Sequence, residues 1–357
     1  MNKVLLISHF PPPAGGIATW TKRILSIGLP DGWGIDHVNS NTINGRDPFK
    51  NTKRNIKDEY IRSKNIWKQE KEFLQKDKDI KVVHTNIPCT VFGMLRETVT
   101  GKIAKKYNKK FILHCRCTVS NVVNSKLKIF FWKRLTKYCE GIIVLNSKSY
   151  EFAKKYSKKS NVKLIPNFVM ESELTFDYNK KINDKIKNVT YVGGVTPEKG
   201  CDVIVKAAEK LSNIEFNLIG IVSKEIKEMN IPKNVILHGN HDNEYVKNAL
   251  MKADVFTFLS RYWGEGFSNA LVEAQAAGLP CIVTDWAANA DQIENSGGIV
   301  VPKNDVDAYV DAIRKLDGDF KFRENASKWN VQKVKSRYID SVVLSSYTKF
   351  YNELIEE

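Results

Sequence analysis

Short apolar runs alternate with longer amphipathic segments along the chain. In the first half, the runs expected to form buried strands are Val4–Ser8, Val82–Thr85, Phe111–Cys115, Gly141–Asn146 and Lys163–Pro166, and the segments with helical spacing are Ile17–Ile27, Tyr60–Gln75, Val91–Tyr107 and Ser125–Cys139. Strands that alternate with helices of this length form parallel βαβ units. The pattern therefore predicts an α/β fold, with helices on both faces of a parallel sheet.

The second half repeats this alternation. Its expected strands are Asn188–Gly193, Glu215–Ile221, Val235–Gly239, Ala253–Leu259 and Pro280–Thr284. A chain of 357 residues also exceeds the size at which one hydrophobic core usually stops growing. We therefore predict two Rossmann-like, doubly wound domains, residues 1–170 and 171–340, with the polar segment 171–187 as the linker. Residues 341–357 are expected to form a C-terminal helix that packs back on the N-terminal domain.

Composition and charge narrow the class of protein. Hydrophobic residues make up 42% and charged residues 27%, as in soluble globular proteins. No run approaches the roughly 20 apolar residues of a membrane span, and the apolar N-terminal stretch is too short for a signal peptide, so a cytoplasmic protein is expected. The net charge of +16 is uneven, because residues 1–170 hold 33 Lys and Arg against 12 Asp and Glu. Such a basic half attracts nucleic acid, an anionic membrane or a polyanionic substrate, and charge alone does not choose among them.

The cysteines and acidic residues give no metal-site pattern. The six cysteines stand at 89, 115, 117, 139, 201 and 281, without a C-x-x-C pair. This spacing predicts neither a zinc site nor a disulfide framework. No Asp-x-Asp stands in a position to hold a divalent ion, and we expect no metal and no cofactor.

Two glycine-containing loops follow predicted strands. Pro11 to Ile17 places Gly15 and Gly16 between the first strand and the first helix, where backbone amides and the helix N-terminus suit a phosphate. A tight turn that needs glycine explains the same pair. In the second half, the segment Tyr191 to Gly200 contains Lys199, which is placed either to hold a diphosphate as a point charge or to be a surface lysine.

A more specific pattern runs from Trp263 to Pro280. Seven residues separate Glu265 from Glu273, and the segment ends in Gly-Leu-Pro before the next strand. If a helix begins near Ser268, Glu265 lies in the preceding loop and Glu273 on the second turn. The two carboxylates are then placed for different parts of one ligand, with helix-start amides between them. A pair of solvated glutamates at a helix end is the alternative.

These motifs together resemble the GT-B glycosyltransferases, specifically glycosyltransferase family 4 (group 1). The resemblance runs nearly end to end: Gly15 and Gly16, the strand ending at His114, Ile165-Pro166-Asn167, Pro197-Glu198-Lys199-Gly200, and E-x7-E. It implies two Rossmann-like domains facing across a cleft that holds the donor, with the acceptor on the basic N-terminal domain.

The resemblance also implies roles for individual residues. Glu265 would bind donor-sugar hydroxyls, Glu273 the ribose, and Lys199 the diphosphate. His114 would contact the donor sugar; a satisfied histidine at the end of a buried strand is the alternative. The implied catalytic set is His114, Glu265 and Lys199, and the implied donor-binding set is Gly15, Gly16, Gly194, Lys199, Arg261, Glu265, Gly266, Phe267, Ser268, Asn269 and Glu273. Family members usually carry arginine where this chain has Gly194; Arg261 is the candidate to compensate for it.

The implied activity is a retaining, metal-independent transfer from a nucleotide sugar, with UDP the expected nucleotide, to a glycan or lipid-linked acceptor in polysaccharide synthesis. The basic half and the run Phe130, Phe131, Trp132, Lys133, Arg134 suggest peripheral association with the inner face of the cell membrane, and burial of the aromatic residues in the core is the alternative. The competing hypotheses are a sugar-nucleotide epimerase of the same fold, a transferase that binds without turnover, and a basic nucleic-acid- or membrane-binding protein without catalysis. No nucleic-acid reading motif supports a nucleic-acid partner.

Overall fold

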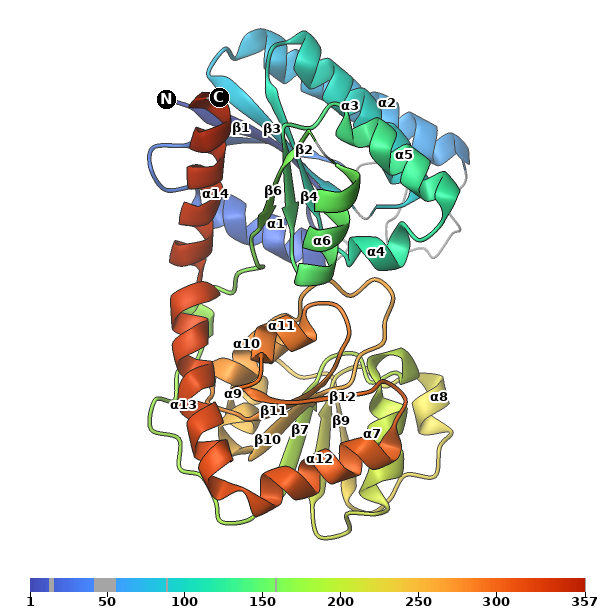
Figure 1. The fold of residues 1–357 in the computed structure, drawn as a ribbon, viewed down its shortest axis with the longest axis vertical. Coiled ribbons are helices and arrows are strands. Elements are labelled where there is room, and N and C mark those ends of the chain that lie inside the picture. The colour runs from blue at the N-terminus through green and yellow to red at the C-terminus, as the bar shows by residue number, and fades with distance from the viewer. Residues whose placement is uncertain (13–15, 42–55, 88, 158, 357) are drawn as a thin grey trace. The chain divides into compact units, whose positions relative to one another are not determined.

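The computed structural model describes residues 1–357 apart from 13–15, 42–55, 88, 158 and 357. The chain divides into two compact units (Figure 1). The first contains Met1–Pro166 and Ser341–Glu357, and the second contains Asn167–Asp340. Each unit is built around its own six-stranded parallel sheet.

The first unit is a doubly wound sheet in the strand order β2-β1-β3-β4-β5-β6. Its elements are β1 (Lys3–Ser8), α1 (Gly16–Ile27), β2 (Gly34–Asn39), α2 (Ile56–Lys76), β3 (Ile80–Ile87), α3 (Val91–Lys106), β4 (Lys110–Cys115), α4 (Val119–Val122), α5 (Lys126–Thr136), β5 (Gly141–Val144), α6 (Ser147–Tyr156), β6 (Asn161–Leu164) and α14 (Asp340–Glu356). The direction of winding reverses between β1 and β3, which is where ligands bind in open parallel sheets.

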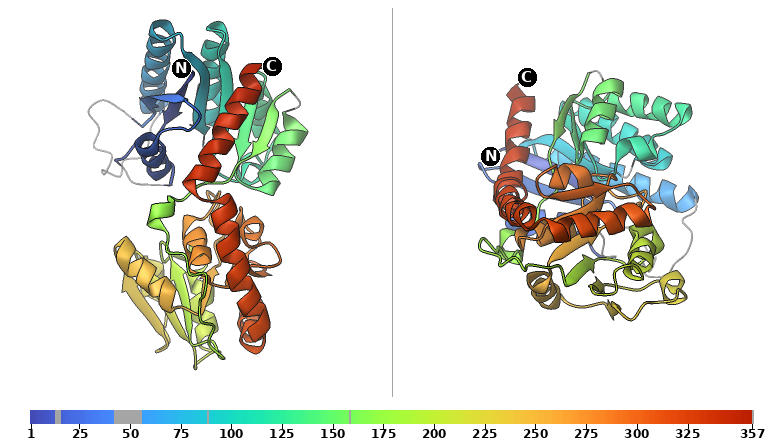
Figure 2. Two further views of the ribbon diagram at one scale, coloured as in Figure 1. Left: turned by 90° about the vertical axis from the view of Figure 1, so that its left-hand side faces the viewer. Right: turned by 60° about the horizontal axis from the view of Figure 1, so that its bottom comes forward.

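The C-terminal helix α14 belongs to this first unit, against whose sheet it lies (Figure 2). Tyr351 reaches β3, where its hydroxyl lies 2.6 Å from His84 Nδ1. Phe350 and Leu354 approach Gly141 of β5 so closely that an added Cβ would lie within 3.0 Å of both. Glycine at 141 therefore lets the helix pack directly on the strand.

The second unit repeats the winding, in the strand order β12-β11-β10-β7-β8-β9. Its elements are η1 (Glu171–Glu173), β7 (Asn188–Val192), η2 (Pro197–Lys199), α7 (Cys201–Ala208), β8 (Glu215–Ile219), α8 (Lys224–Lys227), β9 (Val235–Gly239), α9 (Asn243–Lys252), β10 (Val255–Phe258), α10 (Asn269–Ala276), β11 (Cys281–Thr284), α11 (Asn289–Ile293), β12 (Gly298–Val301), α12 (Val306–Gly318) and α13 (Phe320–Arg337). Here the reversal falls between β7 and β10.

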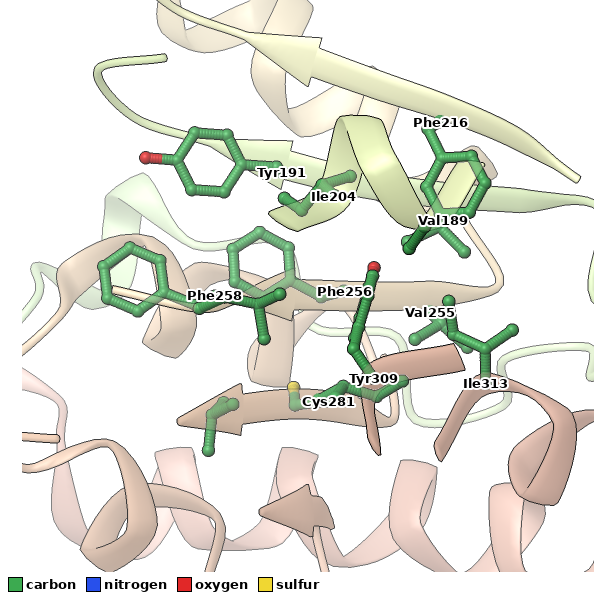
Figure 3. Close-up of a cluster of buried hydrophobic side chains, with 14 of the residues drawn as sticks. Val189, Tyr191, Ile204, Phe216, Val255, Phe256, Phe258, Cys281, Tyr309 and Ile313 are labelled. Carbon is green, nitrogen blue, oxygen red and sulfur yellow. The ribbon is translucent and has the colours of Figure 1, made fainter. Parts of the chain in front are cut away.

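The core of the second unit lies between this sheet and its covering helices. Figure 3 shows Phe256 and Phe258 of β10 beside Tyr191 of β7, with Tyr309 and Ile313 of α12 facing them. The rings of Tyr191 and Phe258 stack with their centroids 6.1 Å apart. The Tyr191 hydroxyl donates to the Gly194 carbonyl at 2.9 Å, so this core side chain also fixes the loop that follows β7.

The prediction of two doubly wound α/β units is confirmed. The sequence pattern missed two strands, β2 and β12, at the outer edges of their sheets. The residues of β2 read Gly-Ile-Asp-His-Val-Asn and are mostly half-buried, so no apolar run marks the strand. The expected strand Lys163–Pro166 begins earlier, as β6 at Asn161.

A buried acidic pair lies between α2 and α3 in the first unit. Glu70 is fully buried, and within the described residues neither of its carboxylate oxygens has a hydrogen-bond partner. Glu97 is buried too, and its carboxylate accepts from Thr85 Oγ1 at 2.9 Å and from Arg96 Nε at 2.6 Å. Burial, and then the charge of Glu97, raise the pKa of Glu70 well above its ordinary value.

This raised pKa predicts that Glu70→Gln stabilises the protein increasingly as pH rises. Above about pH 4.5 the unfolded chain has released the Glu70 proton that the folded protein still holds, so wild-type stability falls as pH rises toward the folded pKa. The slope is at most about 1.4 kcal/mol per pH unit. Calorimetric melting between pH 5 and pH 8 should show the wild-type midpoint falling relative to that of Glu70→Gln.

Glu72→Gln is the matched control for this experiment. Glu72 lies on the same helix, is half-exposed and is 3.9 Å from Lys68. Its substitution should leave the pH dependence of the wild type unchanged. A Glu70→Gln curve parallel to the wild type would show that Glu70 is ionised in the folded protein.

Candidate functional site

The candidate donor residues of the second unit follow β7 and β10, at the point where the winding reverses. Lys199 ends the short turn η2 after β7, and Glu265 lies in the loop after β10. Gly200 follows Lys199 with φ +81°, and a Cβ there would lie 2.3 Å from the carbonyl oxygen of Leu259. Only glycine lets the loop after β7 approach the end of β10 this closely.

These loops bring Lys199 and Glu265 together. Lys199 Nζ lies 2.5 Å from Glu265 Oε2, which also accepts from Ser260 Oγ at 3.1 Å. The ammonium group lies 4.9 Å from the centre of the Tyr262 ring. Both charged side chains are largely buried, so the geometry of the pair is better fixed than that of an ordinary surface ion pair.

Glu273 lies on the second turn of α10, as the sequence predicts. Ser268 caps this helix, because its Oγ accepts from the Leu271 amide at 3.2 Å. The backbone amide of Ser268 itself donates to Gln292 Oε1 at 3.1 Å, and Gln292 Nε2 donates to the Ser268 carbonyl at 2.9 Å. The expectation that the Ser268 amide helps to bind a sugar is therefore corrected, since a buried glutamine takes that donor.

The structure gives other neighbouring candidates partners within the protein. Asn269 Oδ1 accepts from Asn167 Nδ2 at 2.9 Å, and Phe267 packs edge-on against Tyr338 at 5.3 Å between ring centres. Gly266 is buried in the loop before α10. These three residues shape the loop that carries Glu265.

Arg261 does not take the place of the arginine that is missing at position 194. Both terminal nitrogens of Arg261 donate to the Asp202 carboxylate, at 3.0 and 2.9 Å, which fastens the loop after β10 to the first turn of α7. Gly194 is exposed, and the nearest atom to an added Cβ is Thr196 Cγ2 at 3.9 Å. Steric crowding therefore does not explain why an arginine is missing at position 194.

The candidates of the first unit are arranged differently from the prediction. Gly16 begins α1 and is exposed, while Gly15 lies outside the described residues. His114 is 0% exposed inside β4, where its Nδ1 lies 3.2 Å from His84 Nε2 and its Nε2 lies 3.1 Å from Arg116 Nη1. The expectation that His114 touches the donor sugar is therefore corrected, because protein groups occupy both ring nitrogens.

Arg116 is the residue that the sequence reasoning missed. It directly follows β4 and is 9% exposed. The signal was present, since the charged residue that ends an apolar strand stands at 116 rather than at 114. In a parallel sheet, the residue just beyond the carboxyl end of a strand is better placed to meet a ligand than one within the strand.

The aromatic run on α5 divides between the core and the surface. Trp132 is fully buried and its Nε1 donates to Ser157 Oγ at 2.9 Å, whereas Phe131 is partly buried against the core. Phe130 is 56% and Leu127 62% exposed, on a helix that also carries Lys133 and Arg134 in its last turn. Membrane contact through Trp132 is thus excluded while the helix stays packed.

Among the described residues there is neither a bilayer-crossing helix nor a cluster of metal-ligating side chains. No helix there combines the length and apolar content that a bilayer crossing requires. Likewise, that part of the chain contains no group of three or more His, Cys, Asp or Glu side chains arranged to hold a metal ion.

Comparison with known proteins places these features in a family. Residues 174–331, all in the second unit, match the model described as "Glycosyl transferases group 1". The chain is 28% identical over 296 residues to UDP-Gal:alpha-D-GlcNAc-diphosphoundecaprenol alpha-1,3-galactosyltransferase from Escherichia coli, with 72% of this chain and 70% of that protein covered. It is 26% identical over 171 residues, 45% of each protein, to N-acetylgalactosamine-N,N'-diacetylbacillosaminyl-diphospho-undecaprenol 4-alpha-N-acetylgalactosaminyltransferase from Campylobacter jejuni.

A solved structure extends the likeness to the whole fold. Sucrose-phosphate synthase from Thermosynechococcus elongatus matches over 100% of both chains with a TM-score of 0.77 at 17% identity. The second unit thus matches the group 1 glycosyltransferases, the chain is similar to named glycosyltransferases, and its fold is a GT-B architecture of two Rossmann-like units.

Proposed function

We propose that this glycosyltransferase moves a sugar from a nucleotide-diphosphate sugar, a UDP-sugar first, to a diphosphate-linked lipid acceptor in the synthesis of a cell-surface polysaccharide. The observation that carries the donor half is the ion pair of Lys199 and Glu265 at the reversal point of the second sheet. The Escherichia coli relative, named for UDP-galactose and a diphosphoundecaprenol acceptor, supports the choice of both substrates.

The ion pair suits a diphosphate donor because a lysine ammonium group donates in three directions. Glu265 Oε2 accepts one of these hydrogen bonds at 2.5 Å and holds the ammonium group in place. The other N–H groups of Lys199 are proposed to donate to phosphate oxygens, and the Glu265 carboxylate is proposed to bind a sugar hydroxyl. Glu273, on the helix that follows, is the proposed partner of the ribose.

We propose that Lys199 stabilises the diphosphate leaving group through its positive charge. As the bond between the sugar and the diphosphate breaks, negative charge grows on the leaving oxygen, and a fixed cation lowers the energy of that transition state. We propose that Lys199 does this without a divalent metal. Retention of anomeric configuration, with an α-linked product from an α-linked donor, remains part of the proposal.

The acceptor is proposed to meet the first unit at a membrane surface. Residues 1–170 hold most of the positive charge, and each basic residue close to an anionic bilayer contributes about 1 kcal/mol of attraction. Phe130 and Leu127 on α5 add exposed apolar surface next to Lys133 and Arg134. Contact with the inner face of the cell membrane would bring the enzyme to a lipid-linked acceptor.

Lys199→Met is predicted to weaken binding of the matching nucleoside diphosphate about 10- to 100-fold, because a charge-assisted hydrogen bond is lost. Glu273→Ala should weaken it too, through the ribose. Calorimetric titration of the wild type with UDP, GDP, ADP and TDP identifies the nucleotide that binds. The affinity of each variant for that nucleotide is then measured in the same way. Lys210→Met is the control, since Lys210 pairs with Asp307 at the exposed surface of the same unit.

Two outcomes would count against the donor site. Wild-type protein that binds none of the four nucleotides would contradict nucleotide-sugar transfer. Unchanged affinity in Lys199→Met and Glu273→Ala, with binding intact in the wild type, would move the donor away from β7 and α10.

Gly194→Arg is predicted to increase nucleotide affinity. Family members usually carry arginine at this position, and the space around Gly194 admits a side chain. A second cation on the diphosphate should tighten binding about 10-fold or more. Gly194→Ala separates the effect of the guanidinium from the effect of losing glycine, and equal affinities in the two variants would show that position 194 does not reach the phosphates.

Phe130→Ser combined with Leu127→Ser is predicted to reduce binding to anionic vesicles, because two exposed apolar side chains are removed from the basic helix α5. Flotation with liposomes that contain phosphatidylglycerol measures the bound fraction. The matched control is Phe92→Ser with Leu95→Ser, an exposed pair on α3 of the same unit. Equal loss in both pairs, or no vesicle binding by the wild type, would contradict contact through α5.

A further inference from the structure

A polar cavity of about 660 Å³ lies in the second unit, between helix α9 and the strands β7, β8 and β9. Its volume is within the range of about 300–1,000 Å³ that is typical of small-molecule sites. Most such sites are lined by apolar side chains. The lining of this cavity, termed the α9 cavity, contains two alanines, and its other side chains are polar or charged. The α9 cavity therefore has the size of a ligand site and a surface suited to a polar ligand.

The polar surface of the cavity comes from alternation along β7 and β8. Successive side chains of a strand point to opposite faces of the sheet. Val189 and Tyr191 of β7 lie in the hydrophobic core (Figure 3), whereas Asn188 and Thr190 line the α9 cavity. The strand register places Asn217 of β8 opposite Thr190, and Asn217 lines the cavity too. Parallel sheets covered by helices usually carry apolar side chains on both faces, so core packing does not explain this polar face.

A chain of hydrogen bonds fixes the polar groups on one side of the cavity. Asn217 Nδ2 donates to Glu215 Oε1 at 3.0 Å, and because a carboxylate only accepts, this contact sets the orientation of the amide. Asn217 Oδ1 then accepts from His238 Nε2 at 2.7 Å, and His238 Nδ1 accepts from the Tyr245 hydroxyl at 2.8 Å. The Tyr245 ring also stacks on His241, with 3.7 Å between ring centres. The chain joins β8, β9 and α9 and holds the Tyr245 ring in place.

The charges around the α9 cavity favour an uncharged ligand. Among the described residues that line it, Glu215 and Lys252 are the charged side chains, one of each sign. The hydrogen bonds of His238 require a neutral ring, and burial, followed by the charge of His241, lowers the pKa of His238 below its ordinary value. Phosphate sites instead gather several cations or backbone amides around the anion. The lining therefore does not select a phosphate.

Other polar groups of the cavity are placed to meet a ligand. Thr190 is 2% exposed and lines the cavity, and within the part of the chain that the structure describes its hydroxyl has no hydrogen-bond partner. A buried hydroxyl without a partner is unfavourable, so a group inside the cavity has to supply one. The amides of Asn188 and Asn248 line the cavity from β7 and α9. Hydroxyl and amide groups both donate and accept, and the hydroxyl groups of a carbohydrate match them in both roles.

We propose that the α9 cavity binds a neutral oligosaccharide, held by Thr190, Asn188 and Asn248 beside the ring of Tyr245. This site lies apart from the proposed donor residues of the same unit. Asn188 is the first residue of β7, whereas Lys199 follows the carboxyl end of that strand. Binding of the oligosaccharide does not depend on the proposed donor chemistry, so the two proposals can fail separately.

The first experiment substitutes Thr190→Val, which replaces the hydroxyl by a methyl group of similar size. The probes are maltotriose, cellotriose and triacetylchitotriose, each tested by saturation-transfer NMR and calorimetric titration, with and without UDP. We expect the wild type to bind at least one probe in both conditions, and Thr190→Val to bind it about 3- to 10-fold more weakly. Thr257→Val is the matched control with unchanged affinity, because Thr257 is a buried threonine of the neighbouring strand β10 and does not line the cavity.

The second experiment fills the cavity instead of removing a hydrogen bond. Asn248 is exposed on α9, and Asn248→Trp places a large side chain over the cavity without changing the core. This variant should lose oligosaccharide binding and keep the nucleotide affinity of the wild type. The matched control is Asn243→Trp, the same change at an exposed position of α9 that does not line the cavity.

The outcomes separate this inference from the donor proposal. Wild-type protein that binds UDP but none of the three oligosaccharides would overturn the inference and leave the donor site intact. Oligosaccharide affinity unchanged in both Thr190→Val and Asn248→Trp would overturn the assignment to the α9 cavity. Loss of UDP affinity in Asn248→Trp would make the cavity part of a nucleotide site and would also overturn the inference. Lys199→Met should leave oligosaccharide affinity unchanged.

Circular dichroism and thermal melting of each variant identify a folding failure. If Thr190→Val does not fold, Thr190→Ala replaces it under the same criteria, and Asn248→Trp tests the cavity from the exposed side of α9 in either case.

Discussion

In a parallel sheet every strand points the same way, so all the loops that follow strands gather at one edge. Each unit of this protein has six parallel strands. The winding reverses between β1 and β3 in the first unit and between β7 and β10 in the second. The Lys199–Glu265 pair forms where the loops after β7 and β10 meet. In the other unit, Arg116 follows β4, one strand away from the reversal between β1 and β3, and its guanidinium lies against Trp20 of α1.

Neighbouring side chains fix the positions of the charged groups near the ends of these strands. Lys199 is fixed by Glu265, Ser260 supports the same carboxylate, and the approach of Gly200 to Leu259 brings the two loops within reach. The Arg116 guanidinium lies beside the His114 imidazole and the Trp20 ring.

Much of the candidate site was predictable from local sequence. Glu265 in a loop and Glu273 on the second turn of a helix follow from the Ser268 cap and the E-x7-E spacing, and the structure has them there. The hydrogen bond of the Ser268 amide was not predictable, because its acceptor Gln292 lies 24 residues further along the chain, on α11. The same is true of Arg261, whose partner Asp202 is on another element, and of Trp132, whose surroundings no local pattern records.

The sequence by itself determined the alternation of strands and helices, the glycine positions and the cap of α10, because these depend on residues a few positions apart. It also predicted the family whose model matches residues 174–331, since ordered motifs along one chain carry that signal. Only the tertiary structure decided that His114 is fully buried, because its burial rests on packing by Trp20 and on His84, which the Tyr351 hydroxyl of the last helix contacts. A pattern read along the chain cannot contain contacts between residues more than two hundred positions apart.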